Sequence, residues 1–303
     1  MKPTEIGSRQ AGYDRRDFQS YQKNMKTISK TAKMQSTVLD AKRRGRKIAF
    51  VPTMGALHEG HLSLVRKANK LADIVVVSIF VNPTQFGQSE DLSKYPQSLA
   101  EDKRCLRELD VDYLFLPDEA EMYPDGYVTY VEAGRITSIL EGASRPTHFR
   151  GVTTIVAKLF NIVQPDVALF GQKDAQQALV LRRMVKDLNI PVKLIVAPTV
   201  REKSGIAMSS RNRYFDGEQL NRAACIFQGL KEARKLIRSG EADCGKIVAA
   251  IRKKIRQTKG TEIDYISIND TETLDPIKRV SGRVLISVAV RLDGVRLIDN
   301  IVA

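Results

Sequence analysis

Residues 52–61 read Pro-Thr-Met-Gly-Ala-Leu-His-Glu-Gly-His, between an apolar run at 48–51 and an amphipathic segment that starts at Leu62. The apolar run predicts a buried strand ended by Pro52, and the spacing after Leu62 predicts a helix. Glycines in such a turn let a ligand approach the backbone, and a helix start offers N–H groups and the positive end of its dipole. This strand, turn and helix therefore predict a phosphate-binding site.

The turn also holds two histidines, His58 and His61, which lie three residues apart on one face of the first helical turn. An H-x-x-H pair is also compatible with a zinc site or with two solvated surface imidazoles. His148 is the only other histidine in the sequence, and there is no H-E-x-x-H motif or pair of nearby cysteines. We therefore favour imidazoles that face phosphate over zinc ligands.

The chain on either side of this turn alternates apolar runs with amphipathic segments. Further strands are predicted at 74–81, 113–116, 128–131, 167–170 and 192–196, and helices at 31–41, 98–109, 152–163 and 175–189. Runs that are apolar almost throughout suit a parallel sheet covered on both faces. The pattern predicts an α/β, Rossmann-like doubly wound parallel sheet, with ligands at the carboxyl ends of its strands.

From residue 200 the pattern changes. A loop rich in cations and hydroxyls (199–215), which we expect to be mobile without nucleotide, is followed by predicted helices at 217–239 and 243–258 and strands at 263–268, 284–290 and 295–299. Asp293-Gly294 predicts a hairpin turn between the last two strands. We expect a polar N-terminal extension (1–24), a Rossmann-like domain that carries the phosphate site (25–199) and a smaller C-terminal α+β lid domain (200–303).

Composition indicates a globular protein: 303 residues, 43% hydrophobic, with a net charge of +14. No apolar run is long enough to cross a bilayer, and the three cysteines suggest no disulfide framework, so we expect a cytoplasmic protein without a membrane partner. Much of the basic excess lies at 222–259, where basic and apolar residues alternate as on helices with one solvated face. We predict no nucleic-acid partner, although a non-catalytic basic module that binds nucleic acid stays open as an alternative.

Loops that follow the strands ending at 51, 170 and 196 bring imidazoles, a lysine, an arginine and serine hydroxyls toward one place. These groups meet the recurring needs of phosphoryl transfer. The residues alone predict a nucleotidyl transferase or an adenylating enzyme, without naming the acid.

Four motifs carry a resemblance: P-T-M-G-A-L-H-E-G-H (52–61), F-V-N-P-T-Q-F-G (80–87), G-Q-K-D-A-Q-Q (171–177) and A-M-S-S-R-N-R-Y (207–214). In this order they resemble the pantoate–β-alanine ligases (pantothenate synthetases), members of the H-x-G-H nucleotidyl transferases, over residues from about 25 onward. The M-S-S-R loop is similar to the K-M-S-K-S loop of class I tRNA synthetases. The chain departs from the family at Thr147, where the family usually has glycine, and its 1–24 segment has no counterpart there.

The resemblance implies ATP-dependent condensation of (R)-pantoate with β-alanine to give pantothenate, AMP and pyrophosphate through an enzyme-bound pantoyl adenylate. The alternative is another H-x-G-H nucleotidyl transferase that adenylates a different small acid. The family also implies Mg²⁺, held chiefly by phosphates, and a homodimer joined through the nucleotide-binding domain. Glu101 and Asp102 are conceivable outer metal ligands, or else acids on a solvated helix face.

The site residues follow the motifs. By resemblance, the catalytic residues are His61, the donor, with His58, Lys173, Ser209, Ser210 and Arg211. The ATP site comprises Met54, Gly55, Ala56, Leu57, His58, Glu59, Gly60, His61, Gly171, Gln172, Lys173, Asp174, Val200, Met208, Ser209, Ser210 and Arg211. Pantoate is expected at Gln85, Gln177 and Asn82, and β-alanine at Gln85.

Overall fold

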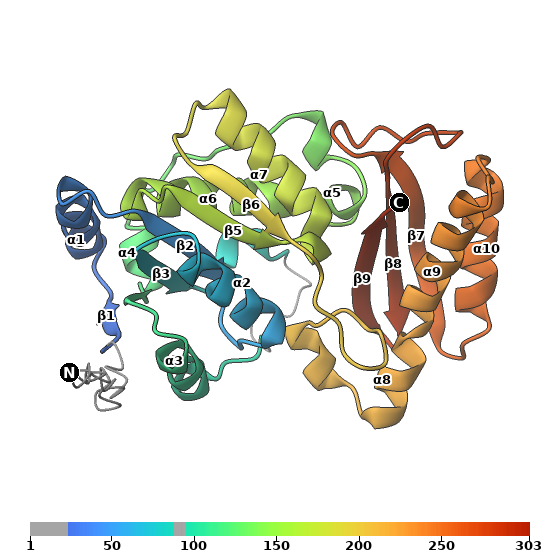
Figure 1. Ribbon diagram of the computed structural model, residues 1–303, viewed down its shortest axis with the longest axis horizontal. Coiled ribbons are helices and arrows are strands. Elements are labelled where there is room, and N and C mark those ends of the chain that lie inside the picture. The colour runs from blue at the N-terminus through green and yellow to red at the C-terminus, as the bar shows by residue number, and fades with distance from the viewer. Residues whose placement is uncertain (1–23, 88–91, 93–94) are drawn as a thin grey trace, which may run out of the picture.

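The computed structural model describes residues 24–87, 92 and 95–303. The expected N-terminal extension, apart from Asn24, lies outside the described residues. Two sheets lie side by side along the long axis of the molecule (Figure 1). We refer to residues 24–199 as the N-terminal part and to residues 200–303 as the C-terminal part.

The N-terminal part is built on a six-stranded parallel sheet in the order β1-β4-β3-β2-β5-β6. Its strands are β1 (Lys26–Ile28), β2 (Ile48–Thr53), β3 (Ile74–Ile79), β4 (Tyr113–Phe115), β5 (Val167–Gly171) and β6 (Lys193–Ala197). The predicted α/β doubly wound parallel sheet is confirmed. From β2 the sheet is extended on one side by β3 and β4 and on the other side by β5 and β6. The strand order therefore reverses between the neighbouring parallel strands β2 and β5.

Five longer helices cover the two faces of this sheet: α1 (Thr31–Arg43), α2 (Glu59–Asn69), α3 (Leu99–Glu108), α6 (His148–Val163) and α7 (Ala175–Asp187). Consecutive residues of a strand point to opposite faces of the sheet and so belong to different cores. Phe50 packs with α1, α6 and α7, whereas Val51 packs with α2 and α3, and neither side chain is exposed. Burial on both faces explains why these strands read as continuous apolar runs.

Two local predictions were wrong and one strand was missed. Pro52 does not end β2 but lies within it, where the ladder to β5 has stopped at Phe50 and only β3 remains alongside. The predicted strand at 128–131 is irregular, and the Val131 N–H and carbonyl pair with threonine hydroxyls of α6 instead. The missed strand, β1, has three residues, too few for a pattern.

The C-terminal part is a three-stranded antiparallel sheet, β7-β8-β9, packed against helices. Its elements are α8 (Gly217–Ala223), α9 (Cys225–Arg238), α10 (Cys244–Arg256), β7 (Thr261–Asp270), β8 (Val284–Leu292) and β9 (Val295–Val302). The helix predicted at 217–239 is thus two helices that meet at Ala224. The predicted hairpin is present, because Leu292 pairs with Val295 and both Asp293 and Gly294 have positive φ.

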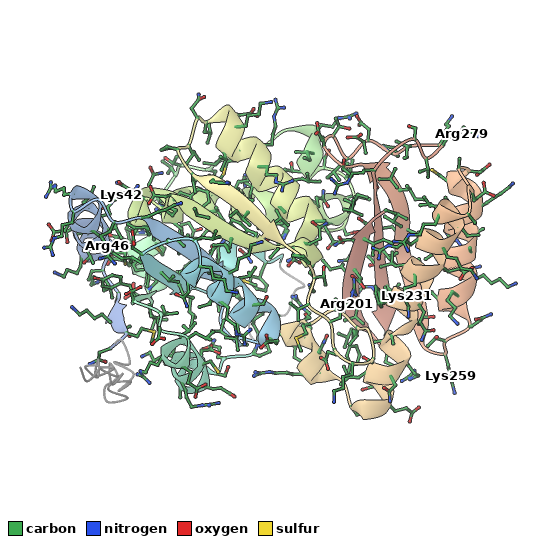
Figure 2. The ribbon with its side chains drawn as sticks, in the orientation of Figure 1. Lys42, Arg46, Arg201, Lys231, Lys259 and Arg279 are labelled. Atoms are coloured by element: carbon green, nitrogen blue, oxygen red, sulfur yellow. The ribbon has the colours of Figure 1, made fainter. Side chains whose placement is uncertain are left out.

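Basic side chains lie at both ends of the molecule. Figure 2 shows Lys42 and Arg46 at the α1 end, and Lys259 and Arg279 at the far end of the C-terminal part.

Candidate active site

A cavity of about 240 Å³ opens at the carboxyl ends of β2 and β5, where the strand order reverses. This is the usual ligand position in doubly wound sheets. Of the predicted site residues, it is lined by Met54, His58, Gly60, His61, Asn82, Gln85, Gly171, Lys173, Asp174, Gln177, Val200, Met208, Ser209, Ser210 and Arg211. Five others do not line it: Gly55, Ala56, Leu57, Glu59 and Gln172.

The two histidines cap helix α2, which begins at Glu59, three residues before the predicted start. The Gly60 N–H donates to His58 Nδ1 at 3.2 Å, and the His58 N–H donates to His61 Nδ1 at 3.4 Å. Glycine at position 60 makes room for the His58 ring, since a Cβ there would lie 2.8 Å from the ring. An Nδ1 that accepts a bond leaves the proton of a neutral imidazole on Nε2. Each ring is therefore held as a donor through Nε2.

Both imidazoles are uncharged at neutral pH. Burial, reinforced by the charge of Lys173, lowers the pKa of His58 to about 4, and burial next to His58 lowers the pKa of His61 to about 3. The rings lie 4.1 Å apart between centroids, so two positive charges there would repel each other. In this structure the two rings are therefore neutral hydrogen-bond donors and not cations.

The lowered pKa values predict an acid-sensitive fold. An unfolded histidine takes up a proton near pH 6.5, but the folded rings do so only near pH 4 and 3, so stability is complete above pH 6.5 and falls toward pH 4. We expect His58→Asn and His61→Asn to reduce the drop in melting temperature between pH 7.5 and pH 5. Calorimetric scans of parent and variants measure this drop, and an unchanged drop in both variants would contradict the assignment.

The turn itself is anchored by a buried carboxylate from α3. Asp102 accepts the N–H groups of Ala56 at 2.9 Å and Leu57 at 2.8 Å, and the Ser98 hydroxyl at 3.1 Å. Gly55 has φ +84°, and a Cβ on it would lie 3.2 Å from Asp102 Oδ2. Sequence reasoning missed this role, since nothing near residues 55–57 points to a partner more than forty positions later.

Two expectations are therefore corrected. Four N–H groups of the turn, those of Ala56, Leu57, His58 and Gly60, are taken by side chains and are not open to a phosphate. Asp102 is buried and not on a solvated face, and its carboxylate holds the turn. Glu101 is on the solvated face, in an exposed ion pair with Arg104. Glu59 also points outward, to Arg66.

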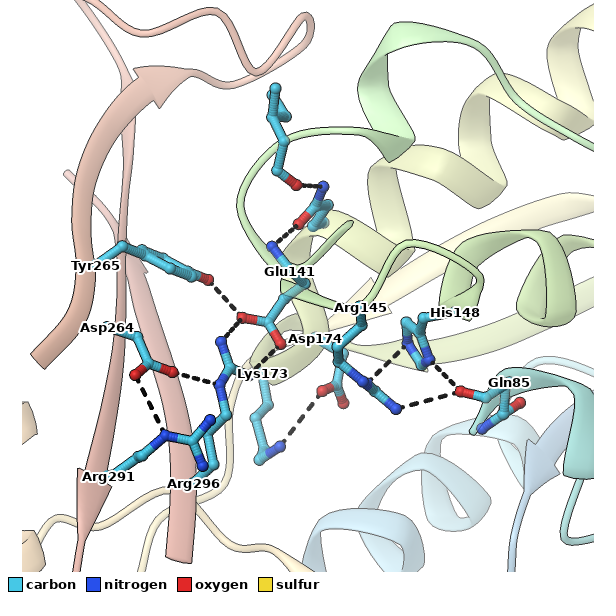
Figure 3. A network of polar contacts seen from close by, with 12 residues as sticks. Gln85, Glu141, Arg145, His148, Lys173, Asp174, Asp264, Tyr265, Arg291 and Arg296 are labelled. Carbon is cyan, nitrogen blue, oxygen red and sulfur yellow. Dashed lines mark hydrogen bonds and ion pairs between the residues drawn. The ribbon is translucent and has the colours of Figure 1, made fainter. Parts of the chain in front are cut away.

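A second cluster fixes Gln85, which is buried and lines the same cavity. Its amide nitrogen lies 2.8 Å from the Met54 sulfur, and its Oε1 accepts from Asn82. Its backbone carbonyl accepts from His148 Nδ1 at 2.9 Å and from Arg145 (Figure 3). Arg145 also lies 3.2 Å from His148 Nε2, which assigns the ring proton to Nδ1. Arg145 and His148 were not predicted as site residues.

The side-chain amide of Asn82 is engaged in hydrogen bonds within the protein. Its Nδ2 donates to Gln85 and to the Gly151 carbonyl, and its Oδ1 accepts from Thr84 and Tyr123. The side chain is 1% exposed. Asn82 therefore orients Gln85, and the expectation that it contacts pantoate has no open donor or acceptor to support it. Thr147, the departure from the family, is exposed at the start of α6 with φ −94°, a conformation that needs no glycine.

The loop at 199–215 is tied to the C-terminal sheet. Arg201 forms a bidentate ion pair with Asp299 of β9, at 2.6 and 2.9 Å, and its guanidinium lies over the Phe227 ring. The Ser210 hydroxyl donates to the Ala56 carbonyl at 3.2 Å and so joins this loop to the histidine turn. Ser210 thus makes a structural contact at the edge of the cavity, which Ser209 and Arg211 also line. These contacts hold Arg201 and Ser210 in this structure, and ordering of the loop by nucleotide stays a prediction.

A larger cavity of about 720 Å³ adjoins the first and extends toward β9, and Arg145, Lys173, Asp174, Ser209 and Arg211 line both. Figure 3 shows the polar wall beside it. Arg296 of β9 donates to both oxygens of Glu141, at 2.6 and 2.9 Å, and Tyr265 donates to Glu141 at 2.8 Å. Burial opposes ionisation of Glu141, but Arg296 outweighs it and lowers the pKa of that carboxyl. This pair holds the two parts of the chain together across the cavity.

Among the described residues, no three histidine, cysteine, aspartate or glutamate side chains gather as a metal site would require. Within the same residues, no helix combines the length and the apolar character needed to span a membrane.

Comparison with known proteins assigns the family. The family model for pantoate-beta-alanine ligase matches residues 26–302. The chain belongs to the pantoate–β-alanine ligase family. A pantothenate synthetase from Syntrophotalea carbinolica is 51% identical over 276 residues, which cover 91% of this chain and 98% of that protein.

Solved structures of pantoate–β-alanine ligases agree in fold. The pantothenate synthetase of Thermus thermophilus is 42% identical, with a TM-score of 0.87 over 91% of this chain and 99% of that one. The pantoate-beta-alanine ligase of Francisella tularensis, solved with beta-gamma ATP and beta-alanine, is 36% identical, with a TM-score of 0.73 over 91% and 97% of the two chains. The chain is an enzyme, a ligase of pantothenate biosynthesis.

Proposed function

We propose that this chain joins pantoate to β-alanine through a pantoyl adenylate formed and kept in the cavity at the ends of β2 and β5. One observation carries the proposal: most of the residues expected to bind the nucleotide line the same 240 Å³ cavity as Gln85 and Gln177, the residues assigned to pantoate. Reaction between two substrates requires such adjacency.

On the nucleotide side, Lys173 and Arg211 supply the positive charge, and His58 and His61 supply neutral Nε2–H donors. Charged donors give the stronger hydrogen bonds to phosphate oxygens. Neutral donors that are fixed in place stabilise charge as it develops, without first having to reorient. Ser209, Met208 and Val200 complete this wall in the proposal.

On the acid side, we assign Gln85 and Gln177 to pantoate, with Gln85 also next to β-alanine. Gln85 is held by Asn82, His148 and Arg145 before any ligand enters. A neutral amide that donates and accepts suits hydroxyl groups, and an acid without those hydroxyls leaves the buried amide unpaired.

In the first step, a pantoate carboxylate oxygen attacks the α-phosphorus of ATP. A bond forms between this oxygen and phosphorus, the bond from the α-phosphorus to the α–β bridging oxygen breaks, and pyrophosphate leaves with that oxygen. The carboxylate is ionised at neutral pH and needs no base. Its in-line placement, together with charge neutralisation around the phosphates, supplies the rate enhancement.

In the second step, the neutral amine of β-alanine attacks the acyl carbon. The carbon–nitrogen bond forms, the bond from carbon to the AMP oxygen breaks, and one proton leaves the nitrogen. The amine starts as an ammonium group with a pKa of about 10, by analogy with lysine, so a second proton is lost before attack.

The proposal extends to the setting of the reaction. Of the two acids expected as outer metal ligands, Asp102 accepts three hydrogen bonds, two from the turn and one from Ser98, and Glu101 faces solvent, so in the proposal the ion arrives on the phosphates of ATP.

We place the protein in the cytoplasm, in accord with three free cysteines, and cell fractionation tests this. We treat residues 25–199 and 200–303 as the catalytic and lid domains.

We further propose a homodimer joined through the N-terminal part. Val128 and Tyr130 there are 81% and 47% exposed, which is unusual for apolar side chains of this size so close in the chain. Sedimentation velocity at micromolar concentration measures the assembly, and a monomer would contradict it.

The test of function is pantoate-dependent exchange of labelled pyrophosphate into ATP. We expect exchange with pantoate and much less with acids that lack its hydroxyls. Gln177→Ala should cost about 1–3 kcal/mol of pantoate binding free energy, which appears as a higher KM for pantoate. The KM for ATP should change far less. Equal effects on both substrates would remove Gln177 from the pantoate site, and exchange without pantoate would overturn the assigned acid.

A further inference from the structure

We propose that two adjacent residues of the last strand, Asp299 and Asn300, are positioning residues that align both phosphate-facing loops of the N-terminal cavity. The inference rests on the proposed function, since it concerns the loops that we assign to ATP. It gives the C-terminal part a role within the catalytic site besides covering it.

Asn300 holds the loop that carries Lys173. Its Nδ2 donates to the carbonyls of Gln172 at 2.9 Å and Lys173 at 2.7 Å, and its Oδ1 accepts from the Gln172 amide at 3.0 Å. The side chain is 4% exposed, and these three bonds engage both ends of its amide. The backbone from which the lysine side chain extends is thereby fixed by a residue more than a hundred positions later.

The local structure of that loop gives it little support of its own. Gln172–Asp174 form a single turn of 3-10 helix, η4, for which no side chain supplies a cap. Short 3-10 turns have poor hydrogen-bond geometry. Clamping two consecutive carbonyls removes the freedom that such a turn keeps, and so fixes where the Lys173 ammonium can reach.

Asp299 holds the other loop. Its carboxylate takes both terminal nitrogens of Arg201, and its Oδ1 also accepts the Asn300 N–H at 2.8 Å. The two sides of the Arg201 turn are bound to each other, because the Met208 N–H donates to the Val200 carbonyl at 3.0 Å. Fixing Arg201 therefore fixes the start of the segment that presents Ser209 and Arg211. One short stretch of β9 thus sets the spacing between the cations of both loops.

The test measures single-turnover adenylate formation and ATP affinity by calorimetry in Asn300→Ala. The matched control is Asn269→Ala, because Asn269 is also buried in the C-terminal sheet and donates to a backbone carbonyl, that of Leu274, away from the cavity. We expect Asn300→Ala to lower the rate about 10- to 100-fold, as misplacement of catalytic groups does, with the KM for pantoate changed less than about threefold. Asn269→Ala should lower the melting temperature but leave the rate within about twofold, because it disturbs no loop of the site.

A double-mutant cycle separates positioning from general damage. If Asn300 acts through Lys173, then Asn300→Ala should cost less than about threefold in a Lys173→Ala background. Equal losses in both backgrounds, or a loss matched by Asn269→Ala, would overturn the proposal. Asn300→Ser keeps one donor and should fall between the parent and Asn300→Ala, which serves as the readout if the alanine variant does not fold.

Failure of the proposed function would look different. A parent that shows no pantoate-dependent exchange would reject the adenylation reaction. The ATP titrations would still decide the inference, since Asn300→Ala should weaken ATP binding and Asn269→Ala should not. Unchanged ATP affinity in Asn300→Ala would reject the alignment of the nucleotide loops even if the parent is active.

Discussion

A stable mimic of pantoyl adenylate, in which a sulfamoyl link replaces the acyl phosphate, is expected to bind at least 10³-fold more tightly than ATP or pantoate, about 4 kcal/mol. Gln85 and Gln177, which we assign to the acid, line the same cavity as Lys173 and the histidines, which we assign to the nucleotide, so one joined ligand can reach both sets. Such a ligand loses its translational and rotational freedom once instead of twice. Titration calorimetry measures the gain.

Two variants show whether both sets of residues take part. The gain should shrink in Gln177→Ala, which removes one of the residues assigned to the acid, and in Lys173→Ala, which removes a cation assigned to the nucleotide. Glu59→Ala is the matched control, because Glu59 belongs to the same motif as the histidines but pairs with Arg66 away from the cavity. A mimic that binds no better than ATP would mean that the two substrates do not adjoin.

The second large effect is expected for His61→Ala, which should slow adenylate formation by about 10²–10³ with the fold intact. The imidazole is held with Nε2–H free of the capping bond, and the loss of one fixed donor to a developing charge has this magnitude. Single-turnover kinetics under saturating ATP measure the chemical step.

His61→Gln distinguishes a neutral donor from a cationic or basic histidine. Glutamine carries an amide N–H and no charge at any pH, so it should restore part of the lost rate if donation from Nε2 is the role. Recovery of at least about tenfold over His61→Ala is expected. Equal rates for the two variants would point instead to a proton-transfer role, and a rate for His61→Ala within tenfold of the parent would exclude His61 from the chemistry.

Sequence periodicity predicted the scaffold well because burial on two faces leaves a strong signal. Strand β2 shows why, since Phe50 and Val51 enter different cores and both must be apolar. The stretch at 128–131 misled the same reasoning. Its valines and tyrosine have the composition of a strand, but its backbone partners are side-chain hydroxyls of α6, which no local pattern reveals.

The residues of the candidate site were found where motifs are contiguous and missed where the support comes from elsewhere in the chain. The histidine turn, Lys173 and Gln85 were all predicted, and the cavity brings them together. In the sequence, Asp102 was interpreted only as one of two acids on an amphipathic helix. Its burial against backbone N–H groups follows from the packing of α3 beside the turn, so only the folded structure reveals it.

The position of β9 in the chain has a consequence for synthesis. Proteins leave the ribosome from the N-terminus at about 5–20 residues per second, and the sheet that carries the cavity is complete by Ala197. The loops that carry Arg201 and Lys173 gain their bonds to Asp299 and Asn300 only after about a hundred more residues have been made. The nascent chain can thus fold its nucleotide-binding scaffold early, while the alignment of its cations waits for the final strand.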